Sequence, residues 1–188
     1  MNPLIELQSA RLHLRAWRPQ DRDAFATLNA DPEVMAFFPA PLTRSQSDAL
    51  ADRIEARMAE HGWGLWALEL EGSSDFIGFT GLNPVPDMLP FAPAIEIGWR
   101  LARPFWGRGL ASEAAQCAAT CAFGPLGLGE IVSFTTLGNH RSLAVMARLD
   151  MVCDGQFDHV GLPEGHALRR HWLYRLDRNT AARRRLAT

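Results

Sequence analysis

A glycine-rich turn lies between a strand-like apolar segment and a run of small residues that is typical of a helix. A turn that opens a helix leaves backbone N–H groups without partners, and these converge on a point that favours an anion. Glycine lets the backbone approach a phosphate closely, and an arginine adds positive charge. The turn therefore predicts a diphosphate site, although a purely structural turn would carry the same glycines. Its residues are Trp106, Gly107, Arg108, Gly109, Leu110, Ala111 and Ser112.

All 19 basic residues of the chain are arginine. The absence of lysine excludes P-loop nucleotide hydrolases, protein kinases and enzymes that form a Schiff base, including those that use pyridoxal phosphate. The Rossmann fingerprint is excluded because the glycine spacing differs and no acidic ribose ligand follows on the next strand. The pyrophosphate turn of a protein that uses an acyl-coenzyme A remains.

The segment EIGWRLARPFWGRGLASEAAQCAATCAF, followed downstream by NHRSLAVMARLDM, resembles the coenzyme-binding core of the GNAT superfamily of N-acetyltransferases. The specific likeness is to the branch of the RimJ/RimL-type ribosomal-protein N-terminal acetyltransferases. RLHLRAWRPQD, NADPEVMAFFP, GQFDHV and LYRL extend it over nearly the whole chain.

This resemblance implies that acetyl-coenzyme A is the co-substrate. The acceptor would be a primary amine, either the N-terminal α-amine of a protein or peptide or the amine of a small molecule, attacking directly with the help of a general base. A non-catalytic acyl-coenzyme A binding or sensor domain is the alternative, and it would need no general base. An interaction domain whose glycine turn is structural is a third interpretation.

The resemblance also assigns coenzyme contacts outside the turn. In the family the pantetheine arm lies like an added strand against the fourth strand, which here corresponds to Ile97, Gly98 and Trp99. Gly98 also fits a β-bulge. Asn139 matches a coenzyme-contacting asparagine and equally fits a helix N-cap. Trp106 stands where the family usually has Gln or Arg, so Arg108 is expected to supply the charge.

Glu96 is the candidate general base, because acetyl transfer needs a neutral amine and most amines are protonated at pH 7. Its side chain points away from the face shared by Ile95 and Ile97, toward the expected thioester site. Apolar surroundings would raise the pKa of its carboxyl toward that of a useful base. The structural alternative is a glutamate that faces solvent or pairs with Arg100 or Arg15.

The general acid for the departing thiolate is less defined. Met146 stands where many family members carry a tyrosine, and the chain's only tyrosine, Tyr174, can equally fill the core. Ser142 matches a serine proposed for the acid role in this branch and is assigned to the coenzyme site as well, although it also fits helix capping. The backbone near Gly98 or Trp99 would polarise the carbonyl oxygen.

Aromatic and charged residues are candidates for the acceptor pocket. The predicted wall is aromatic and the predicted mouth favours a cationic amine. Aromatic side chains at such spacing also fit a hydrophobic core, and a single loop histidine also fits a solvated position. The wall candidates are Phe37, Phe38, Trp63 and Trp66, and the mouth candidates are Asp158, His159 and Glu164.

The pattern of segments predicts an α/β (α+β) fold. The resemblance specifies a mixed, mostly antiparallel sheet that is splayed between its fourth and fifth strands and flanked by helices. The expected order is a strand, two helices, three strands, a helix, a strand, a helix and two pairing strands. These segments fall at 10–17, 19–31, 44–62, 63–70, 75–85, 94–101, 110–123, 130–137, 139–150, 151–160 and 166–177, with Thr43 or Ser45 capping the second helix.

Composition bounds the remaining possibilities. With 188 residues, 47% of them hydrophobic, the chain fits one domain over residues 1–188 with a basic tail at 178–188, expected to be a frayed helix end or a contact for an acidic partner. A net charge of −2 and the absence of a long apolar run argue against nucleic-acid and membrane partners.

Three cysteines without an export signal are expected to be free thiols in the cytoplasm. No metal is expected, because no histidine completes a site with Cys117 and Cys121. Monomer and homodimer stay open.

Overall fold

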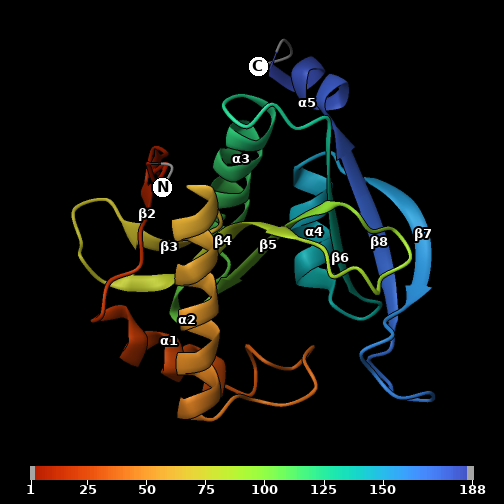
Figure 1. The fold of residues 1–188 in the computed structure, drawn as a ribbon, viewed down its shortest axis with the longest axis horizontal. Helices are drawn as coiled ribbons and strands as arrows, with labels where there is room; N and C mark the ends of the chain where they lie inside the picture. The colour runs from red at the N-terminus through yellow and green to blue at the C-terminus, as the bar shows by residue number, and fades with distance from the viewer. Residues whose placement is uncertain (1–2, 186–188) are drawn as a thin grey trace.

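The computed structural model describes residues 3–185, which form an eight-stranded sheet with helices on both faces (Figure 1). The strands are β1 (Leu7–Gln8), β2 (Leu12–Arg15), β3 (Leu65–Leu70), β4 (Phe76–Pro84), β5 (Ile95–Leu101), β6 (Glu130–Thr136), β7 (Val152–Asp158) and β8 (Arg170–Asp177). The helices are α1 (Asp21–Ala30), α2 (Arg44–His61), α3 (Leu110–Phe123), α4 (His140–Arg148) and α5 (Arg178–Arg185), with a short 3₁₀ helix η1 at Arg103–Phe105.

The strands lie in the order β1-β2-β3-β4-β5-β6-β8-β7. Neighbouring strands are antiparallel except β5 and β6, which are parallel and are joined through α3. Helices α1 and α2 pack together on one face of the sheet, whereas α3 packs on β4 and β5 from the other face and contacts α4 (Figure 1). The predicted mixed, mostly antiparallel sheet is confirmed.

Local signals set the ends of the helices. Thr43, one of the two expected caps, forms a capping box with Gln46 at the start of α2, and Gly62 ends that helix in the left-handed conformation. α3 begins at a left-handed Gly109. Two elements were not expected, the two-residue strand β1 and the 3₁₀ helix η1. The basic tail forms α5 up to residue 185, and residues 186–188 lie outside the described part of the chain.

The feature that matters most for function is the parting of β5 from β6. β4 and β5 pair over seven register positions, from Gly78 with Leu101 to Pro84 with Ile95. β5 and β6 pair at one position only, Glu96 with Val132. Beyond Glu96 the two strands diverge, and the edge of β5 that faces β6 has no strand partner among the described residues. The predicted splay is therefore confirmed, with the family's fourth and fifth strands being β5 and β6 here.

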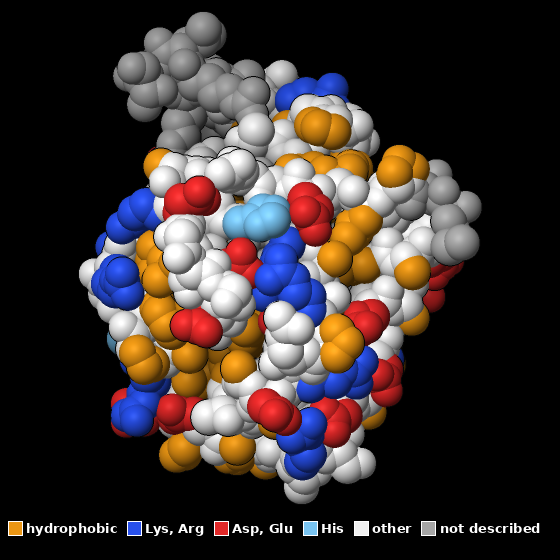
Figure 2. Space-filling view, turned by 90° about the vertical axis from the view of Figure 1, so that its left-hand side faces the viewer, with side chains coloured by type: hydrophobic (Ala, Val, Ile, Leu, Met, Phe, Trp, Pro, Cys, Tyr) orange, Lys and Arg blue, Asp and Glu red, His pale blue; other side chains and the backbone are white. Residues whose placement is uncertain are grey.

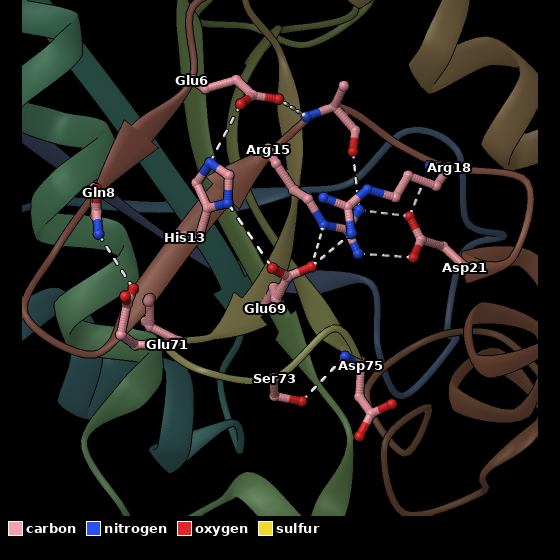
Figure 3. Close-up of polar contacts among 12 residues, drawn as sticks. Glu6, Gln8, His13, Arg15, Arg18, Asp21, Glu69, Glu71, Ser73 and Asp75 are labelled. Carbon is pink, nitrogen blue, oxygen red and sulfur yellow. Dashed lines mark hydrogen bonds and ion pairs between the residues drawn. The ribbon is translucent and has the colours of Figure 1, made fainter.

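A buried ion-pair network ties α1 to the sheet (Figure 3). The fully buried Arg15 on β2 donates to both carboxylate oxygens of Asp21 at 2.7 and 2.9 Å and, through Nε, to Glu69 on β3 at 2.7 Å. Arg18 also pairs with Glu69, and its backbone N–H donates to Asp21. The pKa of Glu69 is held below its usual value by Arg15, against the opposing effect of its own burial. Each charge in this network has a partner.

On the face seen in Figure 2, arginine side chains are interspersed with acidic side chains, and neither sign forms a large patch. Among the described residues, no helix is both long enough and apolar enough to cross a membrane.

We expect Asp21→Ala to destabilise the protein by about 3–5 kcal/mol, because it removes the bidentate partner of a buried guanidinium. Urea unfolding followed by circular dichroism measures this loss. Asp23→Ala is the matched control, since Asp23 lies in the same helix turn and pairs with Arg44 on an exposed surface. Its cost should stay below about 1 kcal/mol. Equal losses in the two variants would contradict the prediction.

Candidate active site

A hollow with a volume of about 560 Å³ lies where β5 and β6 part. Its lining comes from both faces of the sheet, so it passes through the gap between the two strands. On one side it is lined by the turn before α3 and by the first turns of α3 and α4. On the other side it is lined by the α1–α2 linker, by β5 and by the segment between β7 and β8.

The glycine turn lines the end of this cavity next to α3 and α4, which is called the first end below. Gly107 and Gly109 have φ angles of 71° and 77°, a left-handed conformation that favours glycine. No side chain caps α3, so its first N–H groups are left to the cavity, which Leu110, Ala111 and Ser112 line.

Arg11 contacts the turn from outside the cavity. Its Nη1 donates to the Arg108 carbonyl at 3.1 Å, and its Nη2 lies 2.6 Å from Glu113. The geometry is that of an anion site at a helix N-terminus.

The charge beside the turn comes from a residue that the sequence analysis did not single out. Trp106 donates its indole N–H to the Leu101 carbonyl at 2.8 Å, and the guanidinium of Arg141 lies 4.0 Å from the ring centroid. Arg141 lines the cavity, whereas Arg108 packs near Phe105 and is not part of the lining. The arginine that lines the cavity beside the turn is therefore Arg141, and not Arg108 as expected. Its position two residues after the helix-opening Asn139 was the available signal.

Asn139 and Ser142 form one hydrogen-bonded unit at the start of α4. The side-chain carbonyl of Asn139 accepts from the backbone N–H of Ser142 at 3.2 Å, as an N-cap does. Its amide donates to Thr135 Oγ1 at 2.8 Å and to Ser142 Oγ at 3.0 Å. Because Ser142 Oγ accepts this bond and donates to no described residue, its own proton is free to point into the cavity. Asn139 thus orients the Ser142 hydroxyl.

Glu96 lies on the cavity wall at the point where β5 leaves β6. No described residue forms a hydrogen bond or an ion pair with its carboxyl, because Arg15 pairs with Asp21 and Glu69, and Arg100 bonds to Asn29. The structural alternative of an ion pair is therefore wrong. Burial raises the pKa of the Glu96 carboxyl from about 4.5 to about 8.

Gly98 lies beside this carboxyl, and the structure corrects one interpretation of it. β4 and β5 pair without a register shift there, Gly98 facing Gly81, so no bulge is present. A Cβ on Gly98 would have Glu96 Oε1 as its nearest neighbour, at 3.9 Å, which is an ordinary contact. The protein itself therefore has room for a side chain. Gly98 and Trp99 line the cavity, whereas Ile97 is buried in the core that α3 covers.

The aromatic wall is only partly as predicted. Phe37 and Phe38 of the α1–α2 linker line the cavity. Trp66 does not, because it is fully buried in the core and donates its indole N–H to the Ile5 carbonyl at 2.6 Å. Trp63 lines a separate hollow of about 100 Å³ beside α2. These two tryptophans were wrong choices for the wall, since their burial depends on packing against distant segments.

The predicted mouth is also revised. His159 lines the cavity together with His171, whose ring centroid is 5.2 Å away, and burial lowers the pKa of both imidazoles. Both are therefore mostly uncharged at pH 7. Asp158 is bound by Arg170 at 3.0 Å and by Arg169, so its charge is already matched. Glu164 is exposed outside the lining.

The remaining candidates for the general acid are separated by position. Met146 lines the cavity where a tyrosine was considered, and Tyr174 packs against the core and lies outside the lining. Ser142 is the hydroxyl candidate that reaches the cavity.

Comparison with known proteins assigns the family. The profile described as "Acetyltransferase (GNAT) domain" matches residues 11–152. The chain belongs to the GNAT acetyltransferase family. It is accordingly an acetyl-coenzyme A-dependent N-acetyltransferase, a family that acts on amines.

Two relatives illustrate the range of this family. The chain is 34% identical over 148 residues to the FsC-acetyl coenzyme A-N(2)-transacetylase of Aspergillus fumigatus, a match that covers 75% of this chain and 62% of that protein. It is 28% identical to the uncharacterized protein YkkB of Bacillus subtilis, over 80% of this chain and 87% of that one.

Solved structures give the same fold. An acetyltransferase from Agrobacterium tumefaciens superposes with a TM-score of 0.76 and 26% identity over 94% of this chain and 96% of that one. RimL, the ribosomal L7/L12 α-N-protein acetyltransferase, solved with coenzyme A, has a TM-score of 0.75 and 17% identity over 94% and 99%. Mycobacterium smegmatis RimJ has a TM-score of 0.73 and 21% identity over 98% and 93%. RimL and RimJ therefore share the fold of this chain.

The raised pKa of Glu96 predicts a pH-dependent stability difference between wild type and Glu96→Gln. Between about pH 4.5 and pH 8 the carboxyl is protonated in the folded protein and ionised in the unfolded chain, so wild type loses stability as pH rises through this window. The Gln variant lacks that loss.

We expect its melting temperature to gain on wild type by on the order of 5 °C between pH 5 and pH 8. Differential scanning calorimetry at four pH values measures the difference. A constant difference across these pH values would show that the carboxyl is not desolvated.

Proposed function

We propose that this enzyme acetylates a primary amine with Glu96 as the general base and with the coenzyme lying through the gap between β5 and β6. The observation that carries the proposal is the Glu96 carboxyl itself, unpaired and desolvated on the wall of the cavity where the strands part. A domain that only binds an acyl-coenzyme A has no use for such a group. Asp21 and Asp31, by contrast, are carboxylates paired with arginine.

The residues at the first end of the cavity fit the coenzyme. The free N–H groups of the α3 N-terminus and the guanidinium of Arg141 suit a diphosphate. The unpaired edge of β5 from Ile97 to Trp99 offers backbone groups to the amides of a pantetheine arm. Gly107 and Gly109 present no side chain that would block this approach.

Proton transfer then falls to two side chains. Acetyl-coenzyme A supplies the activated acetyl group and a thiol leaving group with a pKa near 8.5. Glu96, about one tenth ionised at pH 7 with a pKa of about 8, accepts the proton that the acceptor amine gives up. The Ser142 hydroxyl, held by Asn139, keeps a free proton directed to the cavity and is the donor available to the thiolate.

Isothermal titration with acetyl-coenzyme A tests the first half of the proposal, and thiol release with a panel of amines and N-terminal peptides tests the second. Glu96→Gln should bind acetyl-coenzyme A as wild type does and lose about 10²- to 10⁴-fold in kcat. Glu130→Gln is the control, a strand glutamate paired with Arg175 outside the cavity, and its kcat should not change.

Binding without thiol release from any amine would support the non-catalytic alternative, and absence of binding would refute the coenzyme site.

Gly98→Ala probes the cavity wall without disturbing the protein. Because the added methyl meets no described atom closer than 3.9 Å, we expect an unchanged melting temperature. The methyl takes space from the ligand, so kcat/KM should fall about 10-fold or more. Steady-state kinetics and thermal unfolding measure the two effects. In contrast, Gly78→Ala places a methyl 2.3 Å from the Arg100 carbonyl oxygen and should lower stability. Normal kinetics in Gly98→Ala would argue that no ligand approaches this strand.

A further inference from the structure

A second ionisable side chain without an ion-pair partner lines the acceptor side of the cavity. Arg100 lies on the same face of β5 as Glu96 and Gly98, because side chains two and four residues apart on a strand share a face. Its Nη1 donates to the buried Asn29 of α1 at 2.6 Å. Its Nε is buried and has no acceptor, and no carboxylate among the described residues forms an ion pair with it.

Two arginines of the sheet, the fully buried Arg15 and the partly buried Arg100, differ in a way that calls for an explanation. Arg15 is neutralised by Asp21 and Glu69. Arg100 has a neutral amide as its hydrogen-bond partner and the rings of Phe38 and Phe79 beside it, and burial lowers its pKa to about 10, so it is still a cation at neutral pH. A desolvated cation without a counter-charge is unfavourable unless a ligand brings the charge.

The free part of the guanidinium has the shape that carboxylates bind. Phe38 covers its face, with the guanidinium carbon 4.1 Å from the ring centroid, which leaves the edges for hydrogen bonds. Nη1 is taken by Asn29, while Nε and Nη2 donate to no described residue. These two N–H groups form the fork that holds a carboxylate with two parallel hydrogen bonds.

Carboxylates near this end of the cavity are already engaged. Glu33, which lines the cavity, and Asp31 are both bound by Arg103. Glu96 makes no ion pair with Arg100 and is four residues away along the strand. The missing negative charge is therefore expected to arrive with the acceptor.

We propose that Arg100 binds a carboxylate of the acceptor, so that the substrates of this enzyme are amines that carry a carboxylate at a distance. The inference rests on the proposed function, because it takes Glu96 as the place where the amine reacts. Four residues of strand separate the two positions by about 13 Å, which puts the carboxylate on the order of 10 Å from the amine. A free α-amino acid is too short to reach both. A peptide with an acidic side chain near its N-terminus and a long ω-amino acid both fit.

Matched pairs of acceptors test this assignment. The peptide arm compares Ala-Glu and Ala-Gly-Glu, as C-terminal amides, with the same peptides carrying Gln in place of Glu. The small-molecule arm compares 8-aminooctanoate with its amide, and L-alanine serves as the short control. Binding is measured by calorimetry on protein saturated with coenzyme A, and kcat/KM by thiol release with acetyl-coenzyme A.

Wild type should favour the carboxylate member of a pair by about 10- to 100-fold, the range of a charge-assisted pair of hydrogen bonds. Arg100→Gln should reduce this ratio to about one. Arg100→Lys, which keeps the charge and loses the fork, should give an intermediate ratio and covers the case in which the Gln variant fails to fold. Arg44→Gln is the control, an exposed arginine outside the lining that pairs with Asp23 and Asp48, and it should keep the wild-type ratio. Coenzyme A affinity verifies that each variant is intact.

The readouts separate this inference from the function on which it rests. A carboxylate preference in binding that disappears in Arg100→Gln supports the inference even where no acetyl transfer follows, in which case the proposed catalytic function alone fails. Equal binding of acids and amides overturns the inference whether or not the amines are acetylated, and leaves Arg100 as a structural partner of Asn29. A preference that persists in Arg100→Gln also overturns it, as does the absence of binding by every acceptor. A preference in the peptide arm indicates a peptide acceptor, and a preference in the small-molecule arm indicates a small-molecule acceptor.

Discussion

The single register contact between β5 and β6, at Glu96 and Val132, is the constraint on which the rest of the site depends. Had the two strands paired along their length, the edge of β5 would be satisfied by β6 and the sheet would be closed. Because they part after one residue pair, the sheet has a gap that is open to both faces. The N-termini of α3 and α4 face this gap from one side and the α1–α2 linker faces it from the other. A ligand that lies through the gap can therefore meet a second ligand that approaches from the opposite face.

The ionisable side chains at this gap differ from those of the Arg15 cluster in having no ion-pair partner. The Arg15 cluster and the Arg11–Glu113 pair match each charge with a partner. Glu96 and Arg100, by contrast, are desolvated on one strand face without a counter-charge from the described residues, which raises one pKa and lowers the other. Such arrangements lower stability, and they are typical of functional sites because the ligand completes them.

The sequence predicts the parts of this structure that depend on neighbouring residues. The Thr43 cap, the face of Glu96 and the pairing of the last two strands all follow from local geometry or strict alternation. The family resemblance added the splay, which no local pattern reveals. The predictions that failed concern residues whose positions depend on packing against distant segments. Trp66 packs in the core, where its indole donates to the Ile5 carbonyl 61 residues away, and Arg100 differs from Arg15 only in what surrounds it. Neither a residue type nor its spacing reports which carboxylates reach a given arginine.

The difference between local geometry and distant packing also explains why the family assignment determines the coenzyme more firmly than the acceptor. The proposed coenzyme end is made of backbone groups, glycines and helix starts within residues 107–142, all inside the region that matches the family profile. The proposed acceptor end is made of side chains from the α1–α2 linker, from β5 and from the β7–β8 segment with His159 and His171, which lies beyond the matched residues 11–152. Backbone geometry tolerates much variation in sequence, whereas a pocket of side chains changes with each substitution. The acceptor must therefore be inferred from the charges that this particular chain leaves unpaired.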